Sequence, residues 1–476
     1  MPLILGTNSI KDTGFNVANS LRFDSGSSTY LTKGSLGTGS TTKATFSAWI
    51  KKSKLSPSQD IYSLYLDNDN QLRFRLRDNG AITIYISLGN VVVLEKRSTL
   101  LLRDFSAWYH VCLVTDLTQS TSEDKYKIYI NNEKITSYAV NTNTSATSYS
   151  NIVAGGGSYV MHIGSNGQHN DNFYSGYMAE VVHIDGQALD PTSFGEFDED
   201  SPTIWKPIDV SGLTFGTNGF YLDFEDSSAL GNDAGGSNNF TVGNLAAIDQ
   251  STDTCTNNFC TWNPLIIRTG RTAVTFSEGN LKAQHNDTGG NTPSWGTFLL
   301  NSGKWYWEVK ITNAGIIYCG VWQPGYNNGD VSDALNGIVV YRTDGNKQAE
   351  TADTAASYGN SFTTGDILGI AVDVDTGTIW FSKNGTWQNS ATQSEVEAGT
   401  TTNSAFTGKS FATNGIIPSV SAYESSGDAI VEANFGGGTS FSISSGNADA
   451  NGYGNFEYAV PSGYYSLNTK NLSEFG

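Results

Sequence analysis

The sequence is poor in charged residues, in cysteine and in methionine. Charged side chains make up 15% of the 476 residues, and there are four cysteines and three methionines. Glycine, with 52 residues, and aromatic side chains, at 12%, are abundant instead. Aromatic and turn-forming residues favour antiparallel sheets over helices, so the composition predicts an all-β protein. A chain of this length predicts two or three domains.

Positive charge is especially scarce. The formal net charge is −19, and no run of lysine and arginine interrupts the acidic balance. We expect such a surface to repel a phosphate backbone, so the sequence predicts no nucleic-acid partner. The same balance is compatible with divalent cations.

Long hydrophobic runs are absent. The first residues, "MPLILGTNSIKDTGF", have no basic start and an apolar run of only four residues. They match neither a secretion signal nor a membrane span, and no later segment is long enough to cross a bilayer. We therefore expect no membrane insertion, and folding in the cytoplasm of the cell that makes the protein.

Two of the four cysteines lie close together in the sequence. Cys255 and Cys260 are five positions apart in "CTNNFC". They would close a small loop if oxidised and would be free thiols if reduced, and the sequence leaves both open. A zinc site would need two further ligands nearby, and the flanking sequence has none.

The first part of the chain alternates apolar and polar residues. In "KATFSAWIKKS", Phe46, Ala48 and Ile50 fall on one face of a strand and Trp49 falls on the other. "QLRFRLRD", "AITIYISL", "AWYHVCLVTD" and "YKIYINNEKI" follow with the same period of two and with turn residues between them. Short strands of this kind predict a β-sandwich.

Several of these segments together resemble a known family. "FSAWIK", "WYHVCLVTD", "KIYINNEKI" and a later stretch ending in "FYSGYMAEVVHIDGQAL" are similar, in this order, to the laminin-G/concanavalin-like jelly roll. The resemblance covers residues 16–200, after an N-terminal arm at residues 1–15. It implies a jelly-roll sandwich. Relatives usually have Asp-Glu where this chain has Ala179-Glu180, so their ion site is not carried over.

A stretch rich in Gly, Asn and Asp follows, and we interpret residues 201–265 as a connector. Asp223, Asp226 and Asp233 lie there in a loop-like setting. Carboxylate oxygens are ligands that calcium prefers. A calcium site at these three residues is therefore one hypothesis, and a solvated turn is the alternative. No other cofactor is expected.

Residues 266–436 resemble a second family. "GKWYWEVKI", "IIYCGVW" and "GDILGIAVDVDTGTIWFSKNG" are similar in order and approximate spacing to the SPRY/B30.2 domain. The resemblance implies a bent β-sandwich used for recognition. Within the third segment we predict two hairpins, with Asp373 and Asp375 as capping residues at the "DTG" turn and Asn384-Gly385 forming the next turn.

The predicted fold class is therefore all-β. It consists of two antiparallel, jelly-roll-like β-sandwich domains joined by a Gly/Asn-rich connector, and residues 437–476 are expected to form an extended C-terminal tail.

Catalytic motifs are absent from the sequence. A glycosidase on such a sandwich would place two carboxylates at alternating strand positions, as in Glu-x-Asp-x-x-Glu, and no such motif occurs. Gly-x-Ser-x-Gly and His-Glu-x-x-His are absent as well. The sequence therefore predicts no catalytic residue and no enzyme activity.

Two loops have the composition of a sugar-binding surface. Saccharides stack on exposed aromatic rings and form hydrogen bonds with Asn, Asp and Gln side chains. One loop covers residues 164–174 and the other covers residues 321–330, and each has a purely structural turn as its alternative. The candidate ligand contacts are His169 and Asp171 in the first loop, Trp322, Tyr326 and Asn327 in the second, and Trp387 beyond the hairpins.

The end of the chain suggests a biological setting. "FEYAVPSGYYSLNTKNL" resembles the ends of tailed-phage virion proteins that combine concanavalin-like and SPRY modules. The resemblance implies a non-enzymatic virion structural protein, located in a tail fibre or another external appendage. Its expected partners are other virion proteins and host-surface glycans, and the class suggests a homo-oligomer, with a trimer as a hypothesis.

Two other functions stay open at this point. The first is a capsid-decorating or head-fibre protein in which the sandwiches are passive modules. The second is a glycan depolymerase whose active site carries no recognisable motif.

Overall fold

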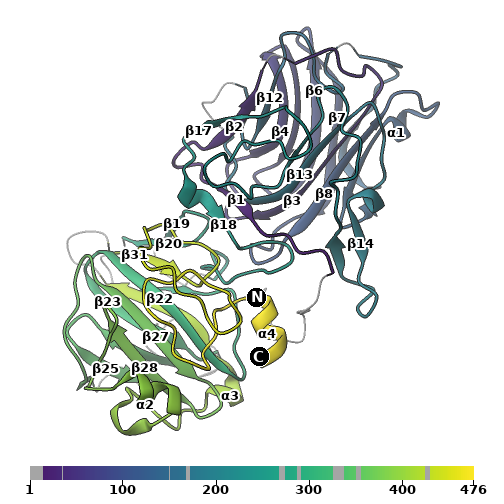
Figure 1. Cartoon of the computed structure of the whole chain (residues 1–476). Coiled ribbons are helices and arrows are strands. Elements are labelled where there is room, and N and C mark those ends of the chain that lie inside the picture. The colour runs from purple at the N-terminus through teal and green to yellow at the C-terminus, as the bar shows by residue number, and fades with distance from the viewer. Residues whose placement is uncertain are drawn as a thin grey trace. The chain divides into compact units, whose positions relative to one another are not determined.

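The structure is a computed structural model that describes residues 14–34, 36–149, 151–167, 172–266, 274–286, 291–324, 337–349, 355–423 and 429–476. The chain divides into two compact units (Figure 1). Residues 13–256 form the unit called here the first domain, and residues 257–476 lie in the second domain. Both are built from antiparallel sheets, which confirms the predicted all-β class.

The first sheet of the first domain has β3 and β13 at its centre. Its strand order is β10 (Glu133–Lys134), β9 (Tyr126–Ile130), β8 (Tyr109–Asp116), β3 (Lys43–Lys52), β13 (Gly176–Asp185), β1 (Ser20–Phe23) and β18 (Gln250–Ser251), and β16 (Phe220–Leu222) also pairs with β13. The short helix α1 (Ser122–Lys125) precedes β9, and β14 (Gly195–Phe197) pairs with β15 (Trp205–Pro207) outside the sheet.

The second sheet of the first domain has eight strands, several of which lie side by side in Figure 1. Its order is β11 (Tyr138–Thr142), β7 (Val91–Leu101), β6 (Ala81–Leu88), β5 (Asn70–Leu76), β4 (Gln59–Asp67), β12 (Val160–Ile163), β2 (Tyr30–Lys33) and β17 (Thr241–Gly243).

The core of the first domain lies between these two sheets. Phe46, Ala48 and Ile50 of β3 are buried in it, as their alternation predicts, and Phe46 stacks on Tyr62 with the ring centroids 4.6 Å apart. Trp49 lies in a separate apolar cluster on the other face of β3. The predicted orientation of this strand is therefore confirmed.

Much of the segment expected as a connector is instead part of the first domain. β16, β17 and β18 each pair with a strand of the two sheets. Two buried ion pairs add to this attachment: Lys51 Nζ lies 2.7 Å from Asp253, and Arg22 lies 3.0 Å from Asp249 in the 3-10 turn Ala247–Asp249. The Gly/Asn-rich composition reflects the many turns between these short strands.

The second domain also contains two sheets. One has the order β19 (Thr275–Ser277), β20 (Lys282–His285), β31 (Ala429–Asn434), β22 (Lys304–Asn313), β27 (Ile367–Asp373), β28 (Thr378–Lys383) and β29 (Thr386–Trp387). The other has the order β21 (Thr292–Trp295), β30 (Ile417–Tyr423), β23 (Ile316–Trp322), β24 (Ile338–Arg342), β25 (Asn346–Ala349) and β26 (Ala356–Ser357). Three short helices complete it: α2 (Gln393–Ala398), α3 (Phe411–Asn414) and α4 (Thr469–Phe475).

The two predicted hairpins are confirmed. β27 pairs with β28 and β28 pairs with β29. Asp373 Oδ1 accepts the backbone N–H of Thr376 at 3.1 Å, so this carboxylate caps the first turn. Asn384 and Gly385 have φ values of 47° and 76°, as a two-residue hairpin turn of type I′ requires.

The C-terminal segment is folded onto the second domain, although an extended tail was expected. Phe456 and Tyr464 are buried in a cluster with Tyr306 of β22 and Trp380 of β28. Glu308 of β22 is fully buried, and its carboxylate accepts the backbone N–H groups of residues 457 and 458 at 2.9 and 2.8 Å. Phe456 and Tyr464 of this segment are therefore core residues of the domain.

Cys255 and Cys260 lie in different domains and are not joined by a disulfide bond. A search of the described residues finds no helix with the length and apolar character that a membrane span needs.

Candidate functional site

The sequence of β5 places three arginines on one face of the second sheet of the first domain. In "QLRFRLRD", Leu72, Phe74 and Leu76 are buried in the core between the sheets. Residues at alternate positions of a strand point to opposite faces. Arg73 and Arg75 therefore lie on the outer face of the sheet, and Arg77 follows with the same period just after the strand ends.

The strand register adds a fourth arginine from β7. Arg75 is opposite Thr83 of β6, and Thr83 is in turn opposite Arg97 of β7. Directly opposed residues of antiparallel strands share a face. We call the set of Arg73, Arg75, Arg77 and Arg97 the arginine face.

One of these arginines is neutralised within the protein. Arg73 forms a two-point ion pair with Asp60, in which Nε lies 3.0 Å from Oδ1 and a terminal nitrogen contacts Oδ2. Asp60 is fully buried. The negative charge of Asp60 is therefore balanced by Arg73, and the ion pair fixes the position of the Arg73 guanidinium group.

The other three arginines make no ion pair with any residue that the structure describes. Arg75 lies over the ring of Tyr85, with the guanidinium carbon 5.6 Å from the ring centroid. Burial, together with the positive charges of Arg73 and Arg77, lowers the pKa of Arg75 to about 10 against the opposing effect of Asp60 and Glu95. Arg75 thus stays positively charged at neutral pH in a partly desolvated position.

Several polar atoms at this face are buried without a protein partner. They are Nε of Arg75, Nε of Arg77 and the hydroxyl of Thr83. Buried polar groups are normally hydrogen-bonded, so a water molecule or a polar ligand group would satisfy these atoms. A guanidinium group binds carboxylate, sulfate or phosphate groups through two parallel hydrogen bonds.

The sequence shows no cluster of basic residues, but the fold brings several arginines together. The arginines of β5 are separated by apolar core residues, and Arg97 is about twenty positions further on. No run of positive charge therefore exists along the chain, although the register brings the four onto one face. The period-two spacing of "RFRLR" was the available signal.

The loop of residues 164–174 begins beside the arginine face. Ser63 of β4, which is opposite Arg73, donates a hydrogen bond to the carbonyl oxygen of Ser165 at 3.0 Å. Gly167 lies against the ring of Tyr65 so closely that a side chain there would overlap it. His169 and Asp171, the candidate contacts of this loop, lie outside the described residues.

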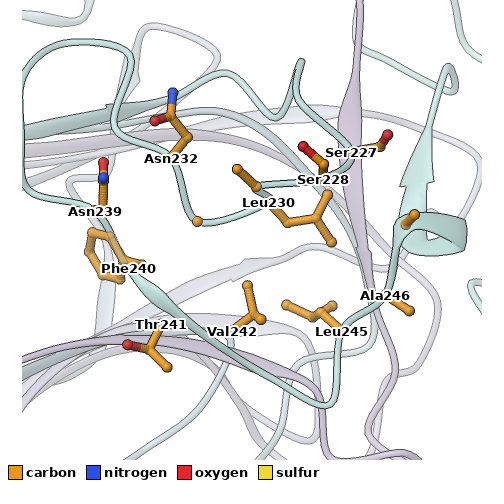
Figure 2. A pocket seen from close by; sticks show the side chains of 13 residues that line it. Ser227, Ser228, Leu230, Asn232, Asn239, Phe240, Thr241, Val242, Leu245 and Ala246 are labelled. Carbon is orange, nitrogen blue, oxygen red and sulfur yellow. The ribbon is translucent and has the colours of Figure 1, made fainter.

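A pocket of about 490 Å³ lies elsewhere in the first domain, next to the edge strand β17. Figure 2 shows Leu230 and Val242 on opposite sides of it. Its lining combines apolar side chains with hydroxyl and amide groups and includes no charged residue; the polar members are Ser227, Ser228, Asn232, Asn239 and Thr241. The pocket therefore suits a neutral ligand.

Trp322 and Trp387 are structural residues of the second domain. Trp322 is 5% exposed and packs against Trp295, with the ring centroids 5.3 Å apart. Trp387 is 8% exposed, and its Nε1 donates to Gln393 Oε1 at 2.7 Å. Neither ring offers a face on which a sugar could stack. Tyr326 and Asn327 lie outside the described residues.

The three aspartates of the calcium hypothesis act as caps of turns. Asp233 accepts the backbone N–H groups of Tyr221, Gly235 and Asn238 at 2.8–3.0 Å. Asp226 accepts from the N–H and hydroxyl of Ser228, and Asp223 accepts the N–H of residue 225. Within the described ranges, no three His, Cys, Asp or Glu side chains form a group that could hold a metal ion. The structure therefore favours the turn interpretation.

A buried serine and histidine lie in contact in the first domain, at Ser47 and His110. His110 Nδ1 accepts the indole N–H of Trp205 at 3.1 Å, so its proton is on Nε2, which lies 2.8 Å from Ser47 Oγ. In this tautomer the imidazole donates to the serine and cannot remove its proton. Burial also lowers the pKa of His110 to about 3. The pair is therefore a packing feature and not a nucleophile with its base.

Family models match both parts of the chain. Residues 24–192 match the model of the concanavalin A-like lectin/glucanases superfamily, and residues 304–437 match the model of the SPRY domain. The first domain is concanavalin-like, and the second is a SPRY domain. Both resemblances stated from sequence are confirmed, and both modules are of lectin or binding type.

Three solved structures that match parts of the chain are 13–19% identical to it. The SPRY domain of human HERC1 is 19% identical, with a TM-score of 0.27 over 36% of this chain and 96% of that one. A Bacteroides ovatus protein provisionally described as carbohydrate binding is 19% identical, with a TM-score of 0.33 over 48% of this chain and 59% of that one. The SAP-like pentraxin of Limulus polyphemus is 13% identical, with a TM-score of 0.26 over 37% and 80%.

Proposed function

We propose that this protein is a non-enzymatic binding protein whose concanavalin-like domain binds saccharides on its arginine face. The observation that supports this most directly is the set of unpaired polar atoms around Arg75 and Thr83. Such atoms bind a polar ligand without the loss of existing hydrogen bonds. The turn roles of the aspartates and the tautomer of His110 agree with binding in the absence of catalysis.

The biological setting that we propose is the virion of a tailed bacteriophage. The C-terminal sequence "FEYAVPSGYYSLNTKNL" supports it, as does the combination of two recognition-type modules in one chain. In this setting the protein would be a homo-oligomeric tail fibre or tail-associated appendage in contact with other virion proteins. Its saccharide ligand would belong to the surface of the host cell.

A glycan array probed with the full chain tests the binding function. We expect binding to a restricted group of glycans, and no release of reducing ends when a bound polysaccharide is incubated with the protein. Absence of binding to every glycan would contradict the proposal. Release of reducing sugars would instead identify a depolymerase.

Immunogold labelling of virions with an antibody against the chain tests the setting. Labels on the tail are expected for a tail fibre or appendage, and purified protein should then compete with phage adsorption. Labels confined to the head would identify a capsid-decorating protein, and unlabelled virions would refute the virion assignment.

A further inference from the structure

We infer that the first domain selects acidic saccharides, with Arg75 and Arg97 binding the carboxylate or sulfate groups of the sugar chain. The inference rests on the proposed saccharide-binding function and adds the ligand class. It follows from charge, from hydrogen-bonding capacity and from the arrangement of the strands.

The charge of the face is not balanced within the protein. Across β4, β5, β6 and β7, the residues opposite one another form rows on the outer face of the sheet. The two rows that contain Arg73, Arg75 and Arg97 also contain two carboxylates, Asp60 and Glu95. Asp60 is committed to Arg73. In these rows Arg75 and Arg97 therefore exceed the one remaining carboxylate, Glu95, and this excess occurs in a chain whose net charge is −19. An anionic ligand would supply the missing charge, whereas a neutral sugar would leave it uncompensated.

The hydrogen-bonding capacity of the arginine face also favours an anionic ligand. Guanidinium groups only donate hydrogen bonds, and ionised carboxylate and sulfate groups only accept them. The hydroxyl group of a neutral sugar both donates and accepts hydrogen bonds, and it usually forms them with Asn, Asp or Gln side chains. The unpaired Nε atoms of Arg75 and Arg77 are donors, so an acceptor-only group satisfies them best.

The strand arrangement allows two anionic groups to be bound. Arg75 and Arg97 are separated by one intervening strand, which places their backbones roughly 10 Å apart. The residue between them is Thr83, whose hydroxyl is buried and unpaired. Arg75 on one side of Thr83 and Arg97 on the other can therefore each bind one of two successive anionic groups of an acidic polysaccharide.

A nucleic acid is the competing polyanion. Single-stranded nucleic acids bind through bases stacked on exposed aromatic rings. The ring of Tyr85 on this face is already occupied by Arg75. The observations therefore favour an acidic saccharide.

Isothermal titration of the full chain with four probes tests the inference. Heparin carries sulfate groups, polygalacturonate carries carboxylates, dextran is neutral, and single-stranded DNA is the nucleic-acid probe. We expect heparin or polygalacturonate to bind and dextran and DNA to bind at least about tenfold more weakly. Comparison of the first two identifies the anionic group. Added salt should weaken binding because the attraction is between charges.

Substitutions then assign the binding to the face. Arg75→Gln and Arg97→Gln should each weaken binding about tenfold to a hundredfold, since each removes charged hydrogen bonds. Arg75→Lys keeps the charge but loses the planar fork, so it should rescue only part of the affinity. Lys134→Gln is the matched control, because Lys134 is an exposed cation on the other sheet of the same domain. Thermal unfolding confirms that each variant folds.

The outcomes separate the inference from the function on which it rests. Equal binding of dextran with unchanged affinity of the arginine variants would overturn the inference and the placement of the saccharide on the arginine face, and would leave saccharide binding itself intact, with the neutral pocket as its place. Binding of DNA as strong as that of heparin would also overturn it. Failure to bind any probe, together with a negative glycan array, would refute both.

Discussion

Glu180 combines an unusual backbone conformation with a buried carboxyl group. Its φ is 49°, at an irregularity of β13 where the pairing with β3 shifts register. Its Oε2 accepts the hydroxyl of Tyr221 at 2.8 Å, and burial raises the pKa of Glu180 to about 8. A carboxyl group in such a setting is protonated at neutral pH, and it makes the stability of the first domain dependent on pH.

The substitution Glu180→Gln tests this dependence. The folded pKa lies above that of the unfolded chain, so the favourable term is fully present below about pH 4.5 and is lost as the pH rises towards 8. We expect the wild-type domain to lose stability over this interval and the variant to lose less, with a difference of at least about 1 kcal/mol at pH 8. Thermal unfolding at a series of pH values measures it. Parallel curves for the two proteins would show that Glu180 does not titrate in this range.

Glu308 has a different role in the second domain. Burial raises its pKa to about 7, while hydrogen bonds from the backbone of residues 457 and 458 oppose that shift. Its side chain fixes the C-terminal segment to β22.

We expect Glu308→Ala to destabilise the second domain by about 2 kcal/mol, because it leaves two part-buried N–H groups without their acceptor. Urea unfolding measures the loss, and limited proteolysis should show earlier cleavage within residues 437–476. Glu133→Ala, at an exposed position of the first domain, is the control. Unchanged proteolysis in Glu308→Ala would mean that the segment is held by its aromatic residues alone.

Among the structural elements, the hairpins of β27, β28 and β29 show how local sequence determines backbone form. Gly385 and Gly365 both have positive φ values, 76° and 94°. A side chain at 385 would come within 2.6 Å of the Tyr458 ring, whereas position 365 has no neighbouring atom within 4 Å. A substitution at position 365 therefore introduces backbone strain alone, whereas one at position 385 introduces backbone strain and steric overlap.

We expect Gly365→Ala to cost about 1 kcal/mol through backbone strain alone. Gly385→Ala should cost about 1 kcal/mol more, because the ring of Tyr458 must also move. Urea unfolding of the two variants provides the comparison. Equal losses would show that the contact with Tyr458 is readily relieved.

The sequence predicted these elements well where the pattern is local. Alternation placed Phe46, Ala48 and Ile50 in the core, and turn residues located the hairpins. The arginine face was not predictable in this way, because it depends on which strands become neighbours. Trp387 was proposed as a ligand contact, and its burial was not predictable, because its apolar cluster also includes Phe456 and Tyr464 from far along the chain.

At the scale of the whole molecule, the limits of the first domain differ from those suggested by composition. Residues 201–256 supply three strands of the two sheets, β16, β17 and β18, and the acidic partners Asp249 and Asp253 of two buried ion pairs. The many Gly, Asn and Asp residues suggested a connector, because strands of two or three residues are too short to produce a recognisable alternating pattern in the sequence.

Two fragments test this limit. We expect residues 14–256 to unfold cooperatively as an isolated domain, and residues 14–200 to be unstable because Lys51 and Arg22 are left buried without counter-charges. Circular dichroism during heating compares the two. A cooperative transition in the shorter fragment at the same temperature would show that residues 201–256 are dispensable.

The pairing of β1 with β18 also has a consequence for synthesis on the ribosome. β1 ends at Phe23, and its partner begins at Gln250. Translation proceeds at roughly 5–20 residues per second, so the first strand waits about 10–45 s before its last neighbour has been made. During this time one edge of the nascent sheet is open to other chains. Expression in the presence of chaperones that shield strand edges should therefore raise the yield of folded protein.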